Sequence, residues 1–407
     1  MTSAASDAVR VRFLISLADG TWVEFADQAV SATQLSVSGL QVYVRELSGL
    51  DAIVLHDAEA LFRQPSPTVR MEALTSVQGL PTATCITDLP PHARPWQQPG
   101  WFTQAAAWLL GAVHASGDTA TGPVRQISTY DLACVLYVET AAGGAYLKAG
   151  DGSREAAVTT RLAALQPELT VPVLRAALSR DWLATRAGGQ RLSEVAELNP
   201  WQEAVTHLAA IHREVDPSVL RGLGCPEFPF RRLVEELEAL VKSEALTRVW
   251  DQDEATRTRL REALPTIRQA HGRILALDLP ERTVHGDAQP MNALVGADGV
   301  RWFDWSEAGV AHPFLDIGWL LAWVSLRPSL PVRTTHPQLV ETLWEDYLRA
   351  LGTAKTGAAW QDARLLALAH RVLAYEQRFR SWEGTVSGAR PYVPYYLKLL
   401  IKLAEEA

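Results

Sequence analysis

The chain has 407 residues, of which 48% are hydrophobic and 21% charged, and its formal net charge is −8. This length predicts two or three domains with ample apolar material for their cores. The acidic balance argues against a nucleic-acid partner, which normally meets a basic surface. The apolar stretches are too short to span a bilayer, and the N-terminus lacks the core of a signal peptide. Three scattered cysteines favour a reducing compartment, so we expect a cytoplasmic protein without a membrane partner.

The first hundred residues predict a small separate domain that is β-rich or α+β. Strands are expected at residues 9–17, 21–25, 40–44, 52–55 and 69–74. An Asp-Gly pair between the first two strands favours a hairpin. We place this domain at residues 1–89, followed by a Pro/Trp-rich linker at 90–101 and an amphipathic helix at 102–113. No motif indicates what the N-terminal domain does.

The next segment predicts two strands, at residues 135–140 and 145–149, joined by a glycine-containing turn. Lys148 lies in the second strand, in a chain that has only five lysines. Small and apolar residues at helical spacing predict a helix over residues 155–165, with Ser153 as its N-cap. The strand-turn-strand-helix order therefore places a rare lysine on a strand shortly before a helix.

The second half of the chain is expected to be mostly helical. Helices are predicted at residues 201–215, 231–249 and 254–277. Pro265 should kink or split the last of these, because proline removes a backbone donor and clashes with the preceding turn. We interpret His212, near the end of the first helix, as a structural histidine.

The most informative motif runs from His285 to Asn292, with the sequence HGDAQPMN, and is followed by Asp304. It places an asparagine five residues after Asp287 and a second aspartate twelve residues later. Phosphoryl transfer from Mg·ATP uses such a set, in which one carboxylate orients the attacking hydroxyl while an amide oxygen and a carboxylate hold the metal. The protein-kinase loop has the same Asp-to-Asn spacing, although arginine replaces Gly286 there.

Two short strands should follow the motif, at residues 293–295 and 300–303, around a strong Asp-Gly turn. A hairpin of this kind brings Asn292 and Asp304 together, as two ligands of one metal require. The alternative is a loop aspartate with two ordinary turn residues. A metallohydrolase is disfavoured because no histidine pair has metal-ligand spacing, and neither a Walker loop nor a serine-hydrolase elbow occurs.

These residues, together with HPFLD at 312–316, resemble the signature of the aminoglycoside phosphotransferase family, which includes choline-kinase-like small-molecule kinases. The resemblance covers about residues 124–407. It implies an α+β, protein-kinase-like fold, with a β-rich N-lobe and its leading helix at 102–187 and a mostly helical C-lobe at 188–407. The chain departs from the usual family sequence at Ala288, Gln289 and Met291. None of these three side chains takes part in the chemistry. The departure therefore concerns the subfamily more than the reaction.

The resemblance implies a division of roles within the site. Asp287 would be the catalytic residue, while Asn292 and Asp304 would bind Mg²⁺. Lys148 would hold the phosphates of ATP and pair with Glu155. The alternative for Glu155 is an exposed acid that complements the helix dipole.

Further site residues rest mainly on position along the chain. Ser128 is expected in a turn that contacts a phosphate, although an ordinary polar turn would look the same. The adenine should meet backbone groups near Ala184 and Arg186, where a strand runs into a hinge. His285 and Asp316 would be structural supports of the catalytic loop.

We therefore predict an ATP-dependent phosphotransferase, with GTP as an alternative donor, that acts on a hydroxyl of an aminoglycoside-, amino alcohol- or sugar-like small molecule. A catalytically silent kinase fold that binds nucleotide as a regulatory or scaffold protein is the alternative. A protein kinase is disfavoured because no Ala-Pro-Glu follows Asp304. Candidate residues of the acceptor pocket are Glu235, Glu236, Glu238, Trp382 and Glu383. The three neighbouring glutamates are also typical of a solvated helix surface.

Overall fold

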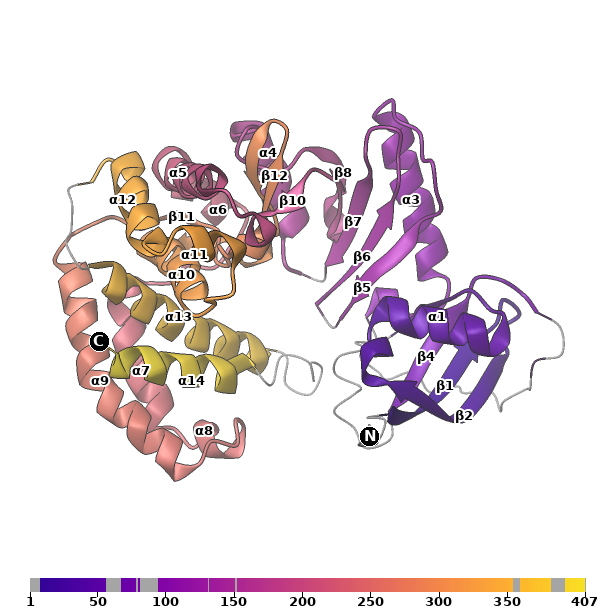
Figure 1. Ribbon diagram of the computed structural model, residues 1–407, viewed down its shortest axis with the longest axis horizontal. Helices are drawn as coiled ribbons and strands as arrows, with labels where there is room; N and C mark the ends of the chain where they lie inside the picture. The colour runs from indigo at the N-terminus through magenta and orange to yellow at the C-terminus, as the bar shows by residue number, and fades with distance from the viewer. Residues whose placement is uncertain are drawn as a thin grey trace. The chain divides into compact units, whose positions relative to one another are not determined.

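A computed structural model describes residues 8–55, 67–77, 80, 94–130, 132–150, 152–353, 359–381 and 392–406. The chain divides into two compact units (Figure 1). The N-terminal unit consists of Met1–Gly152, Leu174–Ala187 and Gly384–Gly388. The C-terminal unit consists of Ser153–Val173, Gly188–Glu383 and Ala389–Ala407. None of the helices in the described ranges has the length and apolar character that a membrane span needs.

A four-stranded sheet with the order β2-β1-β4-β3 forms the first part of the N-terminal unit. Its strands are β1 (Ala8–Ser16), β2 (Trp22–Ser31), β3 (Ala52–Val54) and β4 (Thr68–Ala73). The antiparallel pairing of β1 with β2 confirms the predicted hairpin, whereas β1 and β4 run parallel. Helix α1 (Val37–Ser48) lies against this sheet (Figure 1).

The strand predicted at residues 40–44 is wrong, because this segment lies inside α1. The hydroxyl of Ser36 caps the helix by accepting a hydrogen bond from the N–H of Gly39 at 3.1 Å. Three buried residues then follow at helical spacing: Val37, Leu40 and Val44. The β-branched valines suggested a strand, but capping and one-sided burial favour the helix.

A five-stranded sheet with the order β5-β6-β7-β9-β8 forms the rest of this unit. Its strands are β5 (Arg125–Thr129), β6 (Ala133–Val138), β7 (Ala145–Gly150), β8 (Val173–Ala177) and β9 (Trp182–Arg186). Helix α3 (Trp101–Ala115) contacts β7. The predicted helix and the predicted strand pair with its turn are confirmed here.

A separate N-terminal domain is not confirmed, because hydrogen bonds and a shared hydrophobic cluster join the two sheets within one unit. The buried side chain of Gln126 on β5 accepts from the N–H of Val54 and donates to its carbonyl oxygen, both at 2.9 Å. One hydrophobic cluster draws residues from both sheets and from α3, among them Leu14, Trp22, Ile53, Leu55, Trp96, Trp101, Leu136 and Trp182. The first segment therefore extends the sheet region that follows it.

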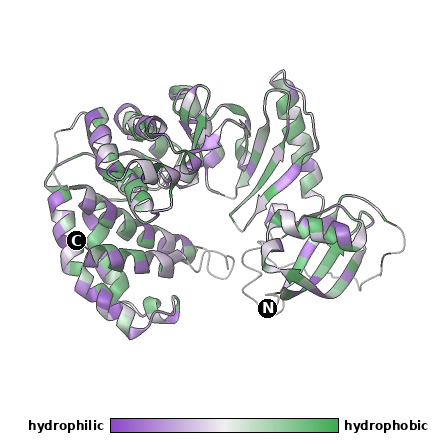
Figure 2. Cartoon of the chain, in the orientation of Figure 1, coloured by the Kyte–Doolittle hydropathy of each residue, from purple (hydrophilic) through white to green (hydrophobic). Residues whose placement is uncertain are grey.

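The C-terminal unit is mostly helical, as predicted. Its helices are α4 (Glu155–Leu165), α5 (Leu198–Glu214), α6 (Pro217–Gly222), α7 (Leu233–Lys242), α8 (Ala245–Arg248), α9 (Glu254–Leu275), α10 (Phe314–Ser325), α11 (Pro331–Thr335), α12 (Leu339–Leu351), α13 (Ala359–Ser381) and α14 (Tyr392–Glu405). Its short strands are β10 (Gln190–Arg191), β11 (Arg282–Val284), β12 (Ala293–Gly296), β13 (Gly299–Trp302) and β14 (Gly309–Ala311). Many of these helices carry both hydrophobic and hydrophilic residues, as Figure 2 shows.

Two predicted helices differ from those observed. The segment predicted as one helix at 231–249 is divided between α7 and α8. Pro265 does not split α9, which is continuous over 22 residues. Both Pro265 and Arg261, whose carbonyl loses its helical partner, are exposed. Water can therefore bind that carbonyl, which lowers the cost of proline inside the helix.

Candidate active site

The predicted hairpin is confirmed and sets the geometry of the motif from His285 to Asp304. β12 and β13 pair antiparallel from Gly296 and Gly299 to Ala293 and Trp302. One step farther, the N–H of Phe303 donates to the carbonyl oxygen of Asn292 at 2.9 Å. The hairpin thus carries the chain from the asparagine of the loop back to the residue before Asp304.

Two backbone conformations in the motif are restricted to particular residue types. Gly286 has φ +81°, and a Cβ atom there would overlap the backbone of Glu307. Only glycine fits this position, which explains why the arginine of the protein-kinase motif is missing. Asp304 also adopts the left-handed conformation, with φ 62° and ψ 60°. Such strain costs about 1 kcal/mol or more and tends to occur at functional sites.

Asp316 joins the catalytic loop to helix α10. Its carboxylate accepts hydrogen bonds from the backbone N–H of His285 at 2.6 Å and of Gly286 at 2.9 Å. His212 Nε2 lies 3.0 Å from the same carboxylate, and His212 Nδ1 lies 2.8 Å from the hydroxyl of Tyr347. Burial alone would raise the pKa of Asp316. The hydrogen bond from His212 and the nearby His285 outweigh burial, so the pKa of Asp316 is lowered. This arrangement holds the loop backbone without reaching the carboxylate of Asp287.

His285 is fully buried, and both of its ring nitrogens are engaged. Nδ1 accepts the N–H of Asp287 at 3.3 Å, so Nε2 carries the proton and donates to the carbonyl oxygen of Phe303 at 2.9 Å. The ring thereby links the start of the loop to the end of the hairpin. No acceptor hydroxyl can reach it, which argues for a supporting role.

Both carboxylate oxygens of Asp287 accept hydrogen bonds. Its hydrogen-bond and ion-pair partners are Trp319 Nε1 at 2.8 Å and Arg371 Nη2 at 3.2 Å on Oδ1, with Gln289 Nε2 at 2.8 Å and Asn292 Nδ2 at 3.0 Å on Oδ2. The side chain keeps 13% of its surface exposed. Burial raises the pKa of Asp287, and the positive charge of Arg371 opposes that shift. The result is an oriented carboxylate with a small exposed surface, suited to contact one hydroxyl group.

A second carboxylate, Glu307, lies in the same cluster. Its oxygens pair with Arg371 at 2.7 Å and Arg378 at 2.8 Å, and the hydroxyl of Tyr375 also donates to it at 3.2 Å. Burial alone raises the pKa of Glu307, but the two guanidinium groups outweigh it and lower the pKa to about 2. Two acids and two arginines thus form one network under the loop that carries Asp287.

Sequence reasoning missed five residues around Asp287: Trp319, Glu307, Arg371, Tyr375 and Arg378. They come from α10, from the turn after Asp304 and from α13, so no local motif contains them. One signal was present, since Arg371 lies inside the mainly apolar stretch LLALAHRVLA at residues 365–374. A charge inside an apolar helical segment is typical of a buried ion pair.

Asn292 and Asp304 supply oxygen atoms that suit Mg²⁺. Asn292 uses its Nδ2 on Asp287, so its amide oxygen is the atom that can bind a metal. Asp304 contributes a carboxylate, of which Oδ1 accepts from Ser306 Oγ at 2.7 Å. Mg²⁺ is usually held by one or two such groups plus phosphates and water. Accordingly, no group of three or more His, Cys, Asp or Glu suited to a metal occurs among the described residues.

The predicted phosphate-binding residues lie in different units. Lys148 lies on β7, in register with Val135 and Leu183. Glu155 begins α4 in the C-terminal unit and is 5% exposed, which excludes the alternative of an exposed acid. The N-cap is Arg154 instead of Ser153, whose hydroxyl accepts the N–H of Glu155 at 3.3 Å. The pairing of Lys148 with Glu155 stays a prediction.

The remaining nucleotide-binding predictions concern the five-stranded sheet. Ser128 lies within β5 and not in the following turn, because the strand extends to Thr129. Ala184 and Arg186 lie on β9, and the guanidinium of Arg186 pairs with Asp118. Contacts of these residues with phosphate or adenine stay predictions.

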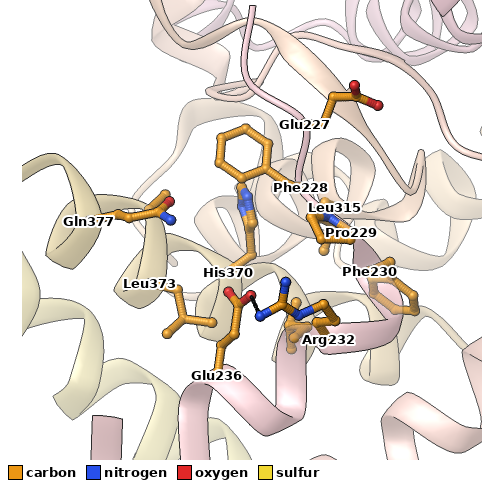
Figure 3. A pocket seen from close by; sticks show the side chains of 12 residues that line it. Glu227, Phe228, Pro229, Phe230, Arg232, Glu236, Leu315, His370, Leu373 and Gln377 are labelled. Carbon is orange, nitrogen blue, oxygen red and sulfur yellow. Dashed lines mark ion pairs between the residues drawn. The ribbon is translucent and has the colours of Figure 1, made fainter. Parts of the chain in front are cut away.

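A cavity of about 240 Å³ lies in the C-terminal unit (Figure 3). It is lined by residues from α7, α10, α13 and the segment before α7: Glu227, Phe228, Pro229, Phe230, Arg232, Leu233, Glu236, Leu315, His370, Leu373, Ala374 and Gln377. Of the predicted acceptor-pocket residues, Glu236 lines it and pairs with Arg232 at 3.5 Å. Glu235 is exposed and Glu238 pairs with Arg268, as expected of a helix surface. Trp382 and Glu383 lie outside the described residues.

Comparison with known proteins agrees with the geometry. A sequence model of the phosphotransferase enzyme family matches residues 135–366, which is more than half of the chain. The chain is similar to a choline/ethanolamine kinase family protein from Mesorhizobium loti, with a TM-score of 0.52 and 19% identity over 75% of this chain and 95% of that one. No curated protein matches the sequence.

Two further solved structures are similar at a TM-score of 0.50. One is a macrolide 2′-phosphotransferase from Brachybacterium faecium, with 16% identity over 73% of this chain and 98% of that one. The other is aminoglycoside 2′-phosphotransferase-IIIa in complex with GDP, with 12% identity over 75% of this chain and 98% of that one. At such identities the similarity establishes a shared fold.

Proposed function

Because the chain belongs to the phosphotransferase enzyme family, we propose that it transfers the γ-phosphate of ATP to a hydroxyl group of a small molecule. The observation that carries the proposal is the catalytic loop itself. Asp287 Oδ2 accepts a hydrogen bond from Asn292 Nδ2 at 3.0 Å, and the hairpin returns the chain from Asn292 to Asp304. This combination supports one catalytic carboxylate next to a pair of metal ligands.

In this proposal Asp287 orients the acceptor hydroxyl and accepts its proton as the oxygen attacks the γ-phosphorus, while the bond from that phosphorus to the β–γ bridging oxygen breaks and ADP leaves. Asn292 and Asp304 would hold Mg²⁺, which supplies positive charge beside the phosphates when bound. Lys148 would hold the α- and β-phosphates, ordered by Glu155. Positioning and electrostatics account for most of the catalysis, because phosphoryl transfer leaves little covalent work to the protein.

The charges around Asp287 bear on the class of acceptor. The names of the similar structures include choline/ethanolamine, macrolide and aminoglycoside kinases, which supports a hydroxyl-bearing small molecule. Asp287 and Glu307 are both already paired with Arg371, and Glu307 also with Arg378. A cationic amine would gain little from carboxylates that are already neutralised. Among the predicted acceptors, these pairs favour a sugar-like one.

An acceptor screen tests the proposal. Purified protein is incubated with Mg·ATP and a panel of sugars, amino alcohols and aminoglycosides, and ADP release is measured with mass detection of the phosphorylated product. We expect ADP release to rise with at least one hydroxyl compound, and the product to gain one phosphate group. If the Asp287→Asn variant released ADP as fast as the wild-type protein with the same acceptor, the role assigned to Asp287 would be contradicted.

A further inference from the structure

Arg371 is an arginine buried beneath the catalytic loop, with only 2% of its side chain exposed. It lies on α13, 85 residues after Gly286, yet its Nη1 donates to the carbonyl oxygen of Gly286 at 2.8 Å. The same nitrogen lies 2.7 Å from Glu307, while Nη2 lies 3.2 Å from Asp287. One guanidinium group therefore connects the loop backbone, the catalytic carboxylate and a second carboxylate.

Aromatic rings hold the guanidinium group from other sides. Its central carbon lies 5.0 Å from the ring centre of Trp319, 4.8 Å from that of Tyr375 and 5.5 Å from that of Tyr396. These distances are those of cation–π contacts, which are stronger away from water. Trp319 also donates to the same Oδ1 of Asp287 that Arg371 approaches. The rings thereby limit both the arginine and the carboxylate to one arrangement.

The chemistry of this position requires arginine rather than lysine. A guanidinium group is planar and presents five donors in fixed directions, whereas an ammonium group is a single compact charge. Only the planar group can bond Gly286, Glu307 and Asp287 at the same time while its faces contact rings. A carboxylate held from a rigid helix keeps its geometry better than one held by its own loop.

We propose that Arg371 is a positioning residue that fixes the carboxylate of Asp287 against the acceptor hydroxyl. This rests on the proposed function, in which Asp287 contacts that hydroxyl. Arg371 is too deeply buried to touch the acceptor, so it acts through Asp287. Arg371 holds Asp287 from helix α13, whereas Asn292 bonds Asp287 from within the same loop.

Replacing the arginine with alanine and adding back its functional group gives a direct test. For Arg371→Ala we expect kcat for ADP release to fall about 100-fold, as for a misplaced catalytic group. The KM for ATP should change less than about threefold, because Arg371 acts on the transfer step and not on nucleotide binding. Millimolar guanidinium chloride should raise kcat of this variant toward the wild-type value. Urea, which has the same shape without the charge, should not.

Two further variants separate positioning from folding. Arg371→Lys keeps the charge, serves as the second test if the alanine variant does not fold, and should lose kcat without a change in the KM for ATP. Arg380→Ala removes an exposed arginine of the same helix that pairs with Glu376. It should retain most of the wild-type kcat and gain nothing from guanidinium.

The outcomes distinguish this proposal from the proposed function. A wild-type protein that neither binds Mg·ATP nor releases ADP would refute the function. If the wild-type protein does both, an Arg371→Ala or Arg371→Lys variant with wild-type kcat refutes only the role of Arg371. Equal losses in Arg371→Ala and Arg380→Ala would also overturn it, because the effect would then not depend on the contact of Arg371 with Asp287.

Discussion

At the scale of single residues, the site is built around a carboxylate that has little freedom to move. Asp287 receives two loop donors, from Gln289 and Asn292, and two donors from distant helices, Trp319 and Arg371. The loop donors lie within five residues of Asp287, inside the same sequence motif. The helix donors become neighbours only through tertiary packing, which no local spacing encodes.

The Asp287→Asn substitution tests the role of this residue. The amide is nearly isosteric but cannot accept a proton from the acceptor, so we expect kcat to fall by about 1,000-fold. The Kd for Mg·ATP should stay within about twofold, since nucleotide contacts are retained. Single-turnover transfer and calorimetry measure the two quantities. A variant that loses ATP binding along with transfer would show that Asp287 supports the nucleotide site instead.

At the scale of elements, the contact of α10 with α13 positions the network. α10 carries Asp316 and Trp319, while α13 carries Arg371, so the crossing of the two helices fixes the distances among all three. The crossing is close at Gly318, where a Cβ atom would overlap the backbone of Ala363. Glycine is therefore needed for packing here, inside a helix where it is otherwise unfavourable.

We expect Gly318→Ala to lower the free energy of unfolding by about 1–3 kcal/mol, because overpacking forces the helices apart. Gly272→Ala is the matched control, since Gly272 also lies in a helix, α9, with open space around its Cβ position. That control should gain up to about 1 kcal/mol from helix propensity. Urea unfolding measures both changes, and equal effects of the two substitutions would contradict the close crossing.

At the scale of the whole molecule, buried histidines tie stability to pH. Burial lowers the pKa of His312 to about 3 and, with the charge of Arg371, that of His370 to about 4. In the unfolded chain a histidine titrates near pH 6.5. Because the folded pKa is depressed, the stabilisation is complete above about pH 6.5. It is then lost progressively as the pH falls toward 4.

His370→Gln tests this dependence. Each such histidine should lower the free energy of unfolding by about 2 kcal/mol between pH 7 and pH 5. The glutamine variant should therefore lose about 2 kcal/mol less than the wild type over this interval in urea unfolding. An unchanged pH dependence in the variant would show that His370 is not held neutral in the folded protein.

Sequence reasoning succeeded where structure is local. The hairpin after Asn292 and the helical second half follow from turn chemistry and periodicity. It failed at residues 40–44, where valines suggested a strand although Ser36 caps a helix. The separate N-terminal domain was also not confirmed, because polar Gln126 gave no sign that it binds Val54 across two sheets. Long-range contacts such as that of Arg371 lie beyond any local pattern.

The measurement that tests the central claim most directly is thermal stability with and without Mg²⁺ and ATP, ADP or GTP, for the wild type and Asp304→Asn. We expect Mg²⁺-dependent stabilisation of the wild type, about 2.7 kcal/mol at 100 times the Kd, which Asp304→Asn largely loses. Asp298→Asn, an exposed aspartate in the hairpin turn, should behave as the wild type. Absence of any shift, confirmed by calorimetry at millimolar nucleotide, would contradict the account and favour the catalytically silent alternative.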